Sequence, residues 1–276
     1  MAIRGQVMRA LLALLIAIFL PSASLAASVE GMAIHSTVQG EGETIIFVHG
    51  WTCDESSWKA QLPAFLDNYR TVTLDLPGHG ASETPASEEN FSMELFVDAV
   101  EAVRNEIGAP RVALVGHSMG AAVIRAYALK YPEHVAGLVA VDGHLDQRAW
   151  TKFEPPSERV TRATRAALIE GMFVDKTSPE LRNQIRNMML GTSALTAQGA
   201  FNAMASPSNQ SDQVIMSPAL TIWAEDGRPD ADFDTRDLIP SWEETRIEGS
   251  GHFLMMERPE EFNALLRKFI SDRAKF

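Results

Sequence analysis

Short apolar runs alternate along the chain with segments whose apolar residues recur every three or four positions. The continuous runs at 44–48, 111–115 and 135–141 predict strands that are buried on both faces of a sheet, and the segments 71–74, 218–224 and 242–247 are expected to be further strands of the same sheet. The periodic segments predict helices that bury one face, at 56–66, 93–107, 121–129 and 259–273. A weakly alternating stretch, 29–38, fits a first edge strand. This alternation predicts right-handed crossover units and a mostly parallel sheet covered on both faces.

The alternation stops between residues 144 and 213, where no strand pattern stands out and short helices are expected at 157–173, 179–190 and 195–205. We interpret this excursion as a helical cap over the carboxyl ends of the strands, where ligands bind in such sheets. We assign its large apolar residues mainly to the core of the cap, with some lining a pocket: Trp150, Phe153, Met172, Phe173, Met188, Met189, Phe201 and Met204. The predicted organisation is a leader (1–26), a core in two parts (27–143 and 214–276) and the cap (144–213).

The first 26 residues have the pattern of a secretory signal peptide. Arg4 and Arg9 precede a short apolar run, 10–20, and Ser24-Leu25-Ala26 follows as a small-x-small cleavage site. The run is too short to span a bilayer comfortably. We expect cleavage after Ala26, with Ala27 as the second choice, and a secreted or periplasmic protein without a stable membrane anchor. The alternative is an uncleaved N-terminal anchor.

Composition narrows the classes of partner. The chain has 24 Lys and Arg against 36 Asp and Glu, a net charge of −12, and the loss of Arg4 and Arg9 with the leader would take it to −14. A dispersed negative charge disfavours nucleic acids and anionic membranes as partners. Cys53 is the single cysteine, so the chain can form neither an internal disulfide nor a cysteine-rich zinc site.

The segment Gly116-His117-Ser118-Met119-Gly120 lies between the strand at 111–115 and the helix at 121–129. A Gly-x-Ser-x-Gly sequence between a strand and a helix is typical of a nucleophile elbow, a sharp turn that exposes the serine Oγ at the end of the sheet. Ser118 is therefore the candidate nucleophile. The amide of Met119, at a helix N-terminus, is a candidate donor to a developing oxyanion.

A serine hydroxyl needs a base within hydrogen-bond reach, and that base needs an orienting carboxylate. His252 is the best candidate base, because it lies in a glycine-rich loop after the last strand, as the chain order serine, acid, histidine requires. Trp51 follows His49-Gly50 at the end of a strand, so its amide is the candidate second oxyanion donor and its indole a pocket wall. We expect His117 to pack beneath the elbow, beside the pocket.

The acid is ambiguous from the sequence. Asp226 follows the strand at 218–224, whereas Asp142 ends the strand at 135–141, and Asp230 is a weaker third candidate. The carboxyl ends of parallel strands share one edge of the sheet. Either Asp142 or Asp226 can therefore reach a histidine that lies over Ser118.

Four segments of the chain resemble the α/β-hydrolase superfamily: His49-Gly50-Trp51, 75–82, 116–120 and 251–259. The resemblance covers most of the mature chain. It implies the α/β-hydrolase fold, with a mostly parallel sheet, helices on both faces, a helical cap inserted after the sixth strand, and a serine esterase-like catalytic triad. Members commonly carry Gly-x-x-Asp-x-x-x-Pro after the seventh strand, and here Gly227 stands where that Asp would be. Some members take the acid from the end of the sixth strand, so the resemblance favours Asp142 and keeps Asp226 as the alternative.

These observations predict a serine hydrolase that cleaves small to medium carboxylic esters or lactones through an acyl-enzyme, with no cofactor and no metal. The same residues could serve as an amide hydrolase, a C–C bond hydrolase or a cofactor-free perhydrolase. A non-catalytic ligand-binding member of the fold is the alternative from another class. Haloalkane dehalogenases and most epoxide hydrolases of this fold use a carboxylate at the elbow, so Ser118 disfavours those reactions. The sequence leaves the oligomeric state open.

Overall fold

The computed structural model describes residues 23–24, 27–148, 159–227 and 234–276. Within them, an eight-stranded sheet has the order β1-β4-β6-β5-β7-β8-β9-β10. Its strands are β1 (Ala23–Ser24), β4 (Ser36–Gln39), β5 (Glu43–Val48), β6 (Tyr69–Leu74), β7 (Val112–His117), β8 (Val135–Val141), β9 (Ala219–Trp223) and β10 (Trp242–Arg246). In this order, each neighbouring pair of strands from β6 through β5 to β10 is parallel, whereas β4 pairs antiparallel with both β6 and β1.

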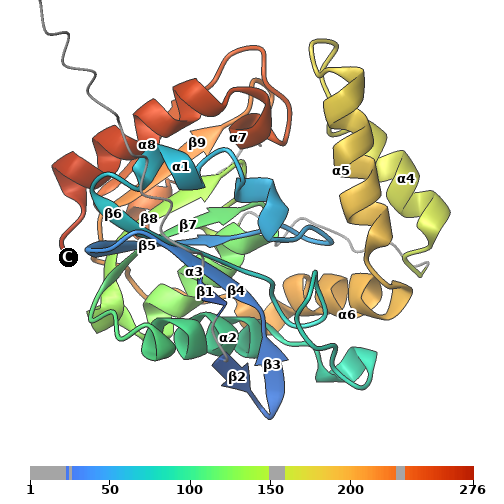
Figure 1. Ribbon diagram of the computed structural model, residues 1–276, viewed down its shortest axis with the longest axis horizontal. Coiled ribbons are helices and arrows are strands. Elements are labelled where there is room, and N and C mark those ends of the chain that lie inside the picture. The colour runs from blue at the N-terminus through green and yellow to red at the C-terminus, as the bar shows by residue number, and fades with distance from the viewer. Residues whose placement is uncertain (1–22, 25–26, 149–158, 228–233) are drawn as a thin grey trace, which may run out of the picture.

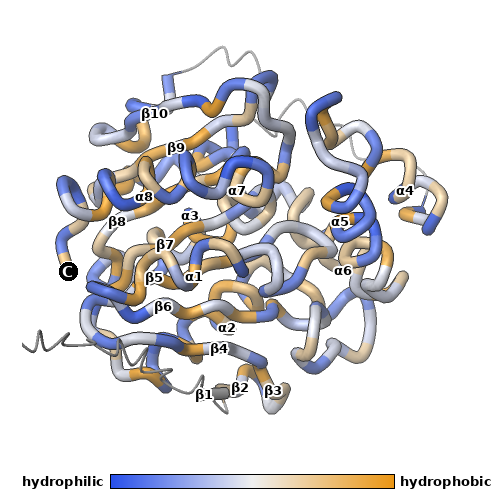
Figure 2. The backbone as a smooth tube through the Cα atoms, turned by 45° about the horizontal axis from the view of Figure 1, so that its top comes forward, coloured by the Kyte–Doolittle hydropathy of each residue, from blue (hydrophilic) through white to orange (hydrophobic). Residues whose placement is uncertain are grey.

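The six predicted strand segments form the six parallel strands, and β8 has the predicted bounds. Figure 2 shows the central strands mainly in hydrophobic colours, because helices cover both of their faces. The stretch 29–38 differs from the expected single edge strand. It divides into β2 (Ala27–Val29), β3 (Met32–Ile34) and β4. Glu30 and Gly31 have φ angles of 50° and 81° and turn the chain back on itself between β2 and β3, which pair with each other, whereas β4 pairs with β6 in the main sheet.

Helices lie on both sides of the sheet (Figure 1). One face is covered by α2 (Met93–Glu106) and α3 (Met119–Lys130), and the other by α1 (Leu62–Phe65) and α8 (Pro259–Arg273), with the short α7 (Leu254–Glu257) before α8. The predicted helix at 56–66 is instead a 3₁₀ turn, Glu55–Trp58, followed by α1. Pro63, which lacks an amide hydrogen, is tolerated at the start of α1 but not inside a longer helix.

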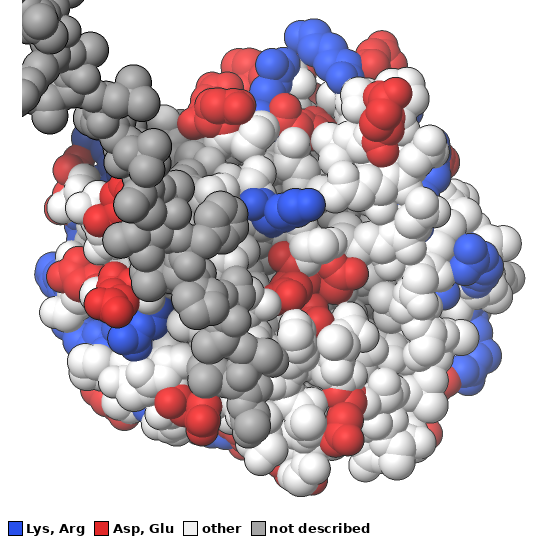
Figure 3. Space-filling view, in the orientation of Figure 1, with Lys and Arg blue, Asp and Glu red and all other residues white. Residues whose placement is uncertain are grey.

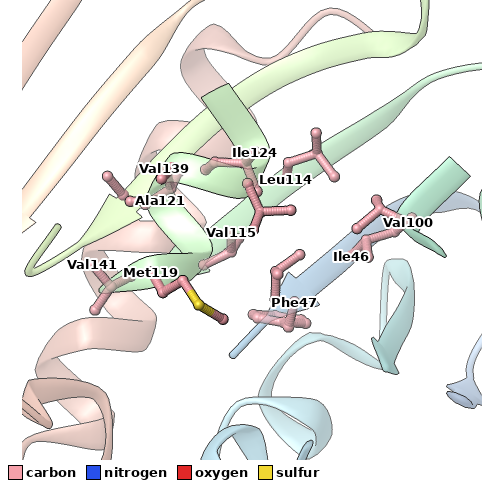
Figure 4. Packing of buried hydrophobic residues seen from close by; sticks show 14 of the residues in the cluster. Ile46, Phe47, Val100, Leu114, Val115, Met119, Ala121, Ile124, Val139 and Val141 are labelled. Atoms are coloured by element: carbon pink, nitrogen blue, oxygen red, sulfur yellow. The ribbon is translucent and has the colours of Figure 1, made fainter. Parts of the chain in front are cut away.

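The core beneath the elbow packs the sheet against α3. Figure 4 shows Phe47 of β5 and Val115 of β7 on the same side as Met119, whose thioether points toward Phe47. All three side chains are fully buried. This packing fixes the start of α3 relative to the ends of the strands, and therefore the position of Ser118.

Between β8 and β9 the structure describes α4 (Arg162–Glu170), α5 (Pro179–Gly191) and α6 (Ala194–Met204), which lie to one side of the strands in Figure 1. Each begins at a hydroxyl N-cap, Thr161, Ser178 or Ser193, whose side chain accepts an amide hydrogen bond. Within the described residues, no helix is both long and apolar enough to cross a membrane. The predicted limits of the cap, 144–213, stay a prediction, and Trp150 and Phe153 lie outside the described residues.

Most of the predicted leader lies outside the described residues. Its residues Ala23 and Ser24 pair with Val38 and Thr37 of β4, at the edge of the sheet. Ala27 is the first residue of β2, and its side chain is buried. Charged side chains of both signs are interspersed over the face shown in Figure 3, in keeping with the dispersed charge of the sequence.

Candidate active site

Ser118 lies at the turn between β7 and α3 with φ 52° and ψ −115°. Its neighbours His117 and Met119 are buried, whereas Ser118 is partly exposed. A Cβ on Gly116 would overlap the carbonyl oxygen of Gly120, and a Cβ on Gly120 would overlap that of Val48. The two glycines are therefore a steric requirement of this turn.

Backbone strain is concentrated around this turn. Among the described residues, those other than glycine with positive φ are Glu30, Thr52, Ser118 and Asp142. Glu30 belongs to the β2–β3 turn, but the other three follow the carboxyl ends of neighbouring strands. Such conformations cost about 1–3 kcal/mol each and persist where the surrounding structure holds them. Three of the four are thus located at the edge of the sheet where the candidate residues meet.

The structure brings His252 and Asp142 together. His252 Nδ1–H donates to Asp142 Oδ2 at 2.6 Å, and the amide of Ala224 donates to Oδ1 at 2.9 Å. Burial alone would raise the pKa of Asp142, but the hydrogen bond and charge of His252 outweigh it and lower that pKa. Asp142 is therefore an ionised partner that fixes the Nδ1–H tautomer of His252.

Of the other two candidate acids, the structure describes Asp226, and it does not bring this residue to His252. Asp226 is exposed, and in the part of the chain that the structure describes its side chain makes no hydrogen bond. Asp230 lies outside the described residues. Gly227, which stands at the position of the usual superfamily acid, is packed so closely on Asp142 that a Cβ there would overlap Oδ1.

The turn that carries Trp51 lies against the elbow. A Cβ on Gly50 would be 3.2 Å from the Cβ of Ser118. Neither the amide of Trp51 nor that of Met119 donates to another described residue, so both remain free for an oxyanion near Ser118. The indole of Trp51 borders the cavity, as expected, and also donates to the carbonyl of Ala197 in α6 at 2.9 Å.

His117 supports the loop that carries the candidate base. Its Nε2–H donates to the backbone carbonyl of His252 at 2.9 Å. Burial, with the nearby charge of His252, lowers the pKa of His117 to about 3. His117 is therefore neutral, and its ring borders the same cavity as Ser118.

A cavity of about 280 Å³ opens onto Ser118 and His252. Its walls are mainly apolar and come from both the core and the cap: Gly50, Trp51, Cys53, His117, Val160, Thr164, Arg165, Leu168, Met172, Met189, Phe201, Met204 and Phe253. Four of the large apolar residues of the predicted cap thus line the pocket: Met172, Met189, Phe201 and Met204. Sequence reasoning missed Arg165 and Leu168, which carry no signal beyond their place in the predicted helix 157–173. Among the described residues, no three His, Cys, Asp or Glu side chains gather as a metal site would require.

Comparison with known proteins agrees with this geometry. Residues 45–265 match the model of the alpha/beta hydrolase family. The chain belongs to this family. Solved structures with the same fold include Est816, described as an N-acyl homoserine lactone degrading enzyme (TM-score 0.76, 24% identity, 90% of this chain and 100% of that one), and a thermophilic esterase from Thermogutta terrifontis (TM-score 0.75, 23% identity, 93% and 100%). The predicted α/β-hydrolase fold is confirmed.

Relatives of this α/β hydrolase are named as enzymes that catalyse different reactions. A 2-hydroxy-6-oxononadienedioate/2-hydroxy-6-oxononatrienedioate hydrolase of Paraburkholderia phymatum is 28% identical, over 87% of this chain and 91% of that protein. Epoxide hydrolase 1 of Caenorhabditis elegans is 25% identical, over 82% of this chain, which spans 64% of that protein's length. The family and these names support a hydrolase. The substrate class has to be argued from the site.

Proposed function

We propose that this α/β hydrolase cleaves small to medium carboxylic esters or lactones through an acyl-enzyme on Ser118. The observation that carries the proposal is the 2.6 Å hydrogen bond from His252 Nδ1–H to Asp142, beside a cavity that also contains Ser118. With its proton on Nδ1, His252 leaves Nε2 free to accept the proton of the serine hydroxyl. In this proposal Ser118 is the nucleophile, His252 the base and Asp142 the orienting acid.

The proposed reaction has two halves. Ser118 Oγ attacks the ester carbonyl carbon while His252 Nε2 takes its proton, and the amides of Trp51 and Met119 stabilise the oxyanion. His252 then protonates the departing alkoxide, which leaves an acyl group on Ser118. A water molecule, deprotonated by His252, attacks this acyl group, and the carboxylic acid departs as the serine hydroxyl is restored.

The identity of the nucleophile separates ester cleavage from epoxide opening, the reaction that the names of several relatives indicate. If Ser118 attacked an epoxide carbon, the product would be an ether, which water and His252 could not hydrolyse. Attack by a carboxylate would form an ester instead, which a water molecule can cleave. Ser118 therefore favours acyl transfer.

The test uses a chromogenic ester and a label for activated serines. Ser118→Ala is expected to lower kcat for para-nitrophenyl butyrate by about 10³-fold or more and to abolish labelling by a fluorophosphonate. Ser208→Ala, an exposed position away from the cavity, is the control and should retain both properties. Circular dichroism of each variant checks the fold. Undiminished turnover by Ser118→Ala would contradict the proposal.

We also propose that the protein is exported and that its mature chain begins at Ala27. Support comes from β2, which begins at this residue and pairs Ala27 with Ile34. Cleavage after Ala26 would leave the β2–β3 ribbon whole and remove only β1 from the described strands.

A further inference from the structure

Arg165 is a buried cation in the wall of the proposed active-site cavity. It lies on α4, its side chain is 4% exposed, and it borders the same cavity as Ser118. One nitrogen, Nη1, donates to the carbonyls of Met189 at 3.2 Å and Thr192 at 2.9 Å, at the carboxyl end of α5. These two bonds hold the guanidinium in place between α4 and α5.

Among the described residues, the rest of the guanidinium has no partner of opposite charge. In the described ranges no carboxylate forms an ion pair with Arg165, and its buried Nε makes no hydrogen bond. Burial, together with the like charge of Arg162, lowers the pKa of Arg165. A buried charge is normally paired, because removing it from water is costly. Arg165 therefore retains unused hydrogen-bonding capacity.

The other buried arginines of the described chain differ in this respect. Arg104 forms an ion pair with Glu101 at 2.7 Å. Arg125 donates to the carbonyls of Asn209 and Ser211. Burial lowers the pKa of Arg125, and the nearby carboxylate of Asp146 partly opposes that shift. Arg165 is the one of these three that borders the cavity containing Ser118, and among the described residues it is also the one on which no carboxylate acts.

We propose that Arg165 forms an anion subsite of the cavity, and that the substrate is an ester bearing a carboxylate away from its scissile carbonyl. This inference rests on the proposed function. A guanidinium matches the geometry of a carboxylate, and their hydrogen bonds are strong where water is excluded. The mainly apolar walls between Arg165 and Ser118 suit the hydrocarbon that separates the two polar ends of such an ester.

The first experiment compares charged and neutral esters. The para-nitrophenyl monoester of glutaric acid carries the carboxylate on the acyl side, the butyryl ester of para-hydroxybenzoate carries it on the alcohol side, and para-nitrophenyl pentanoate is neutral. Arg165→Met should lower kcat/KM for the preferred charged ester by about 10- to 100-fold, and for the neutral ester by less than about threefold. Arg165→Lys, which keeps the charge, should lie between. Whichever charged ester shows the selective loss identifies the side that carries the carboxylate.

Arg162→Met is the matched control. Arg162 lies on the same helix and also donates to the end of α5, to the carbonyl of Leu190 at 2.7 Å, but it does not border the cavity. Its substitution should leave the ratio of charged to neutral turnover unchanged. Equal losses on charged and neutral esters in Arg165→Met would overturn the proposal, because they would show that Arg165 only supports α5.

A second experiment does not depend on turnover. Ser118→Ala protein is titrated calorimetrically with monomethyl glutarate, which is charged, and with dimethyl glutarate, which is neutral. We expect the charged ester to bind more tightly, and Arg165→Met in the same background to remove that difference. Equal binding of the two esters would overturn the anion subsite. Selective binding without any turnover by the wild-type protein would support the subsite while contradicting the proposed reaction.

Discussion

The carboxylate of Asp142 packs directly against Gly227, so that a Cβ on Gly227 would overlap Oδ1 of Asp142. The two residues come from neighbouring parts of the sheet edge, the loop after β9 and the end of β8. The carboxylate of Asp142 thus occupies the place that a side chain at position 227 would need. The absence of a side chain at Gly227 therefore leaves room for the carboxylate of Asp142, which forms the hydrogen bond with His252.

Asp142→Asn is expected to lower kcat for an ester substrate by about 10²- to 10⁴-fold, because the amide no longer stabilises the imidazolium form of His252. Asp226→Asn is the control, since Asp226 is exposed and makes no hydrogen bond in the described part of the chain. It should change kcat by less than about threefold. A larger loss of kcat in Asp226→Asn than in Asp142→Asn would show that Asp226, and not Asp142, is the partner of His252.

The acid should also be transferable between the two positions. Gly227→Asp alone is expected to lower Tm, because overpacking a site of this kind costs about 1–3 kcal/mol. Asp142→Gly removes the obstacle, and glycine accepts the φ of 42° at this position. The double variant should regain at least about tenfold in kcat over Asp142→Gly. No gain in a folded double variant would mean that the loop after β9 cannot direct an acid to His252.

Trp51 links the candidate oxyanion turn to α6, because its indole N–H donates to the carbonyl of Ala197. Trp51→Phe keeps the backbone amide but leaves that carbonyl without its donor, which should destabilise the fold by about 1–2 kcal/mol. We expect KM to rise while kcat stays within a few-fold. Trp223→Phe, which removes an indole bond to Glu244, is a control for loss of a donor elsewhere. An unchanged KM in Trp51→Phe would show that this bond does not shape the cavity.

Stability should decrease as the pH falls below neutral because of buried, neutral histidines. Burial, with the charge of His49 close by, lowers the pKa of His79 from 6.5 to about 3. Below pH 6.5, His79 therefore binds a proton in the unfolded chain but stays neutral in the folded chain. The free energy of unfolding decreases for this reason as the pH falls from 6.5 toward 3. For one such histidine the loss between pH 7 and pH 5 is about 2 kcal/mol.

His79→Gln should remove that part of the pH dependence, as measured by urea unfolding at pH 7 and pH 5. The remaining slope comes from other groups, including His49 and His117, whose pKa values burial also lowers. A slope equal to that of the wild-type protein would mean that His79 titrates normally in the folded chain.

The mature N-terminus is expected at Ala27. Expression of the full chain in a bacterium with a periplasm, followed by intact mass measurement of the periplasmic fraction, should give a chain that begins Ala-Ser-Val-Glu. Ala26→Phe puts a bulky residue next to the cleavage site and should leave the leader attached. An unprocessed wild-type chain confined to the cytoplasm would contradict export.

The sequence by itself determined the features that depend on neighbouring residues. The run 135–141 is apolar throughout because β8 is buried on both faces, and its limits were predicted from that pattern alone. The elbow was predictable for a similar reason, since the small residues Gly116 and Gly120 are required by contacts close to the turn. The separation of β2 from β3 also follows from one local turn, at Glu30 and Gly31, which the weak alternation of 29–38 concealed.

Only the tertiary structure decided what depends on segments far apart in the chain. Asp142 and Asp226 both follow strands at one edge of the sheet, and the path of the loop carrying His252 determines which carboxylate it meets. Arg165 belongs to a short helix whose polar and apolar faces the sequence shows, but its burial arises where α4 packs on α5. Residue spacing reports the period of an element, whereas the partner of a side chain is set by how separate elements pack together.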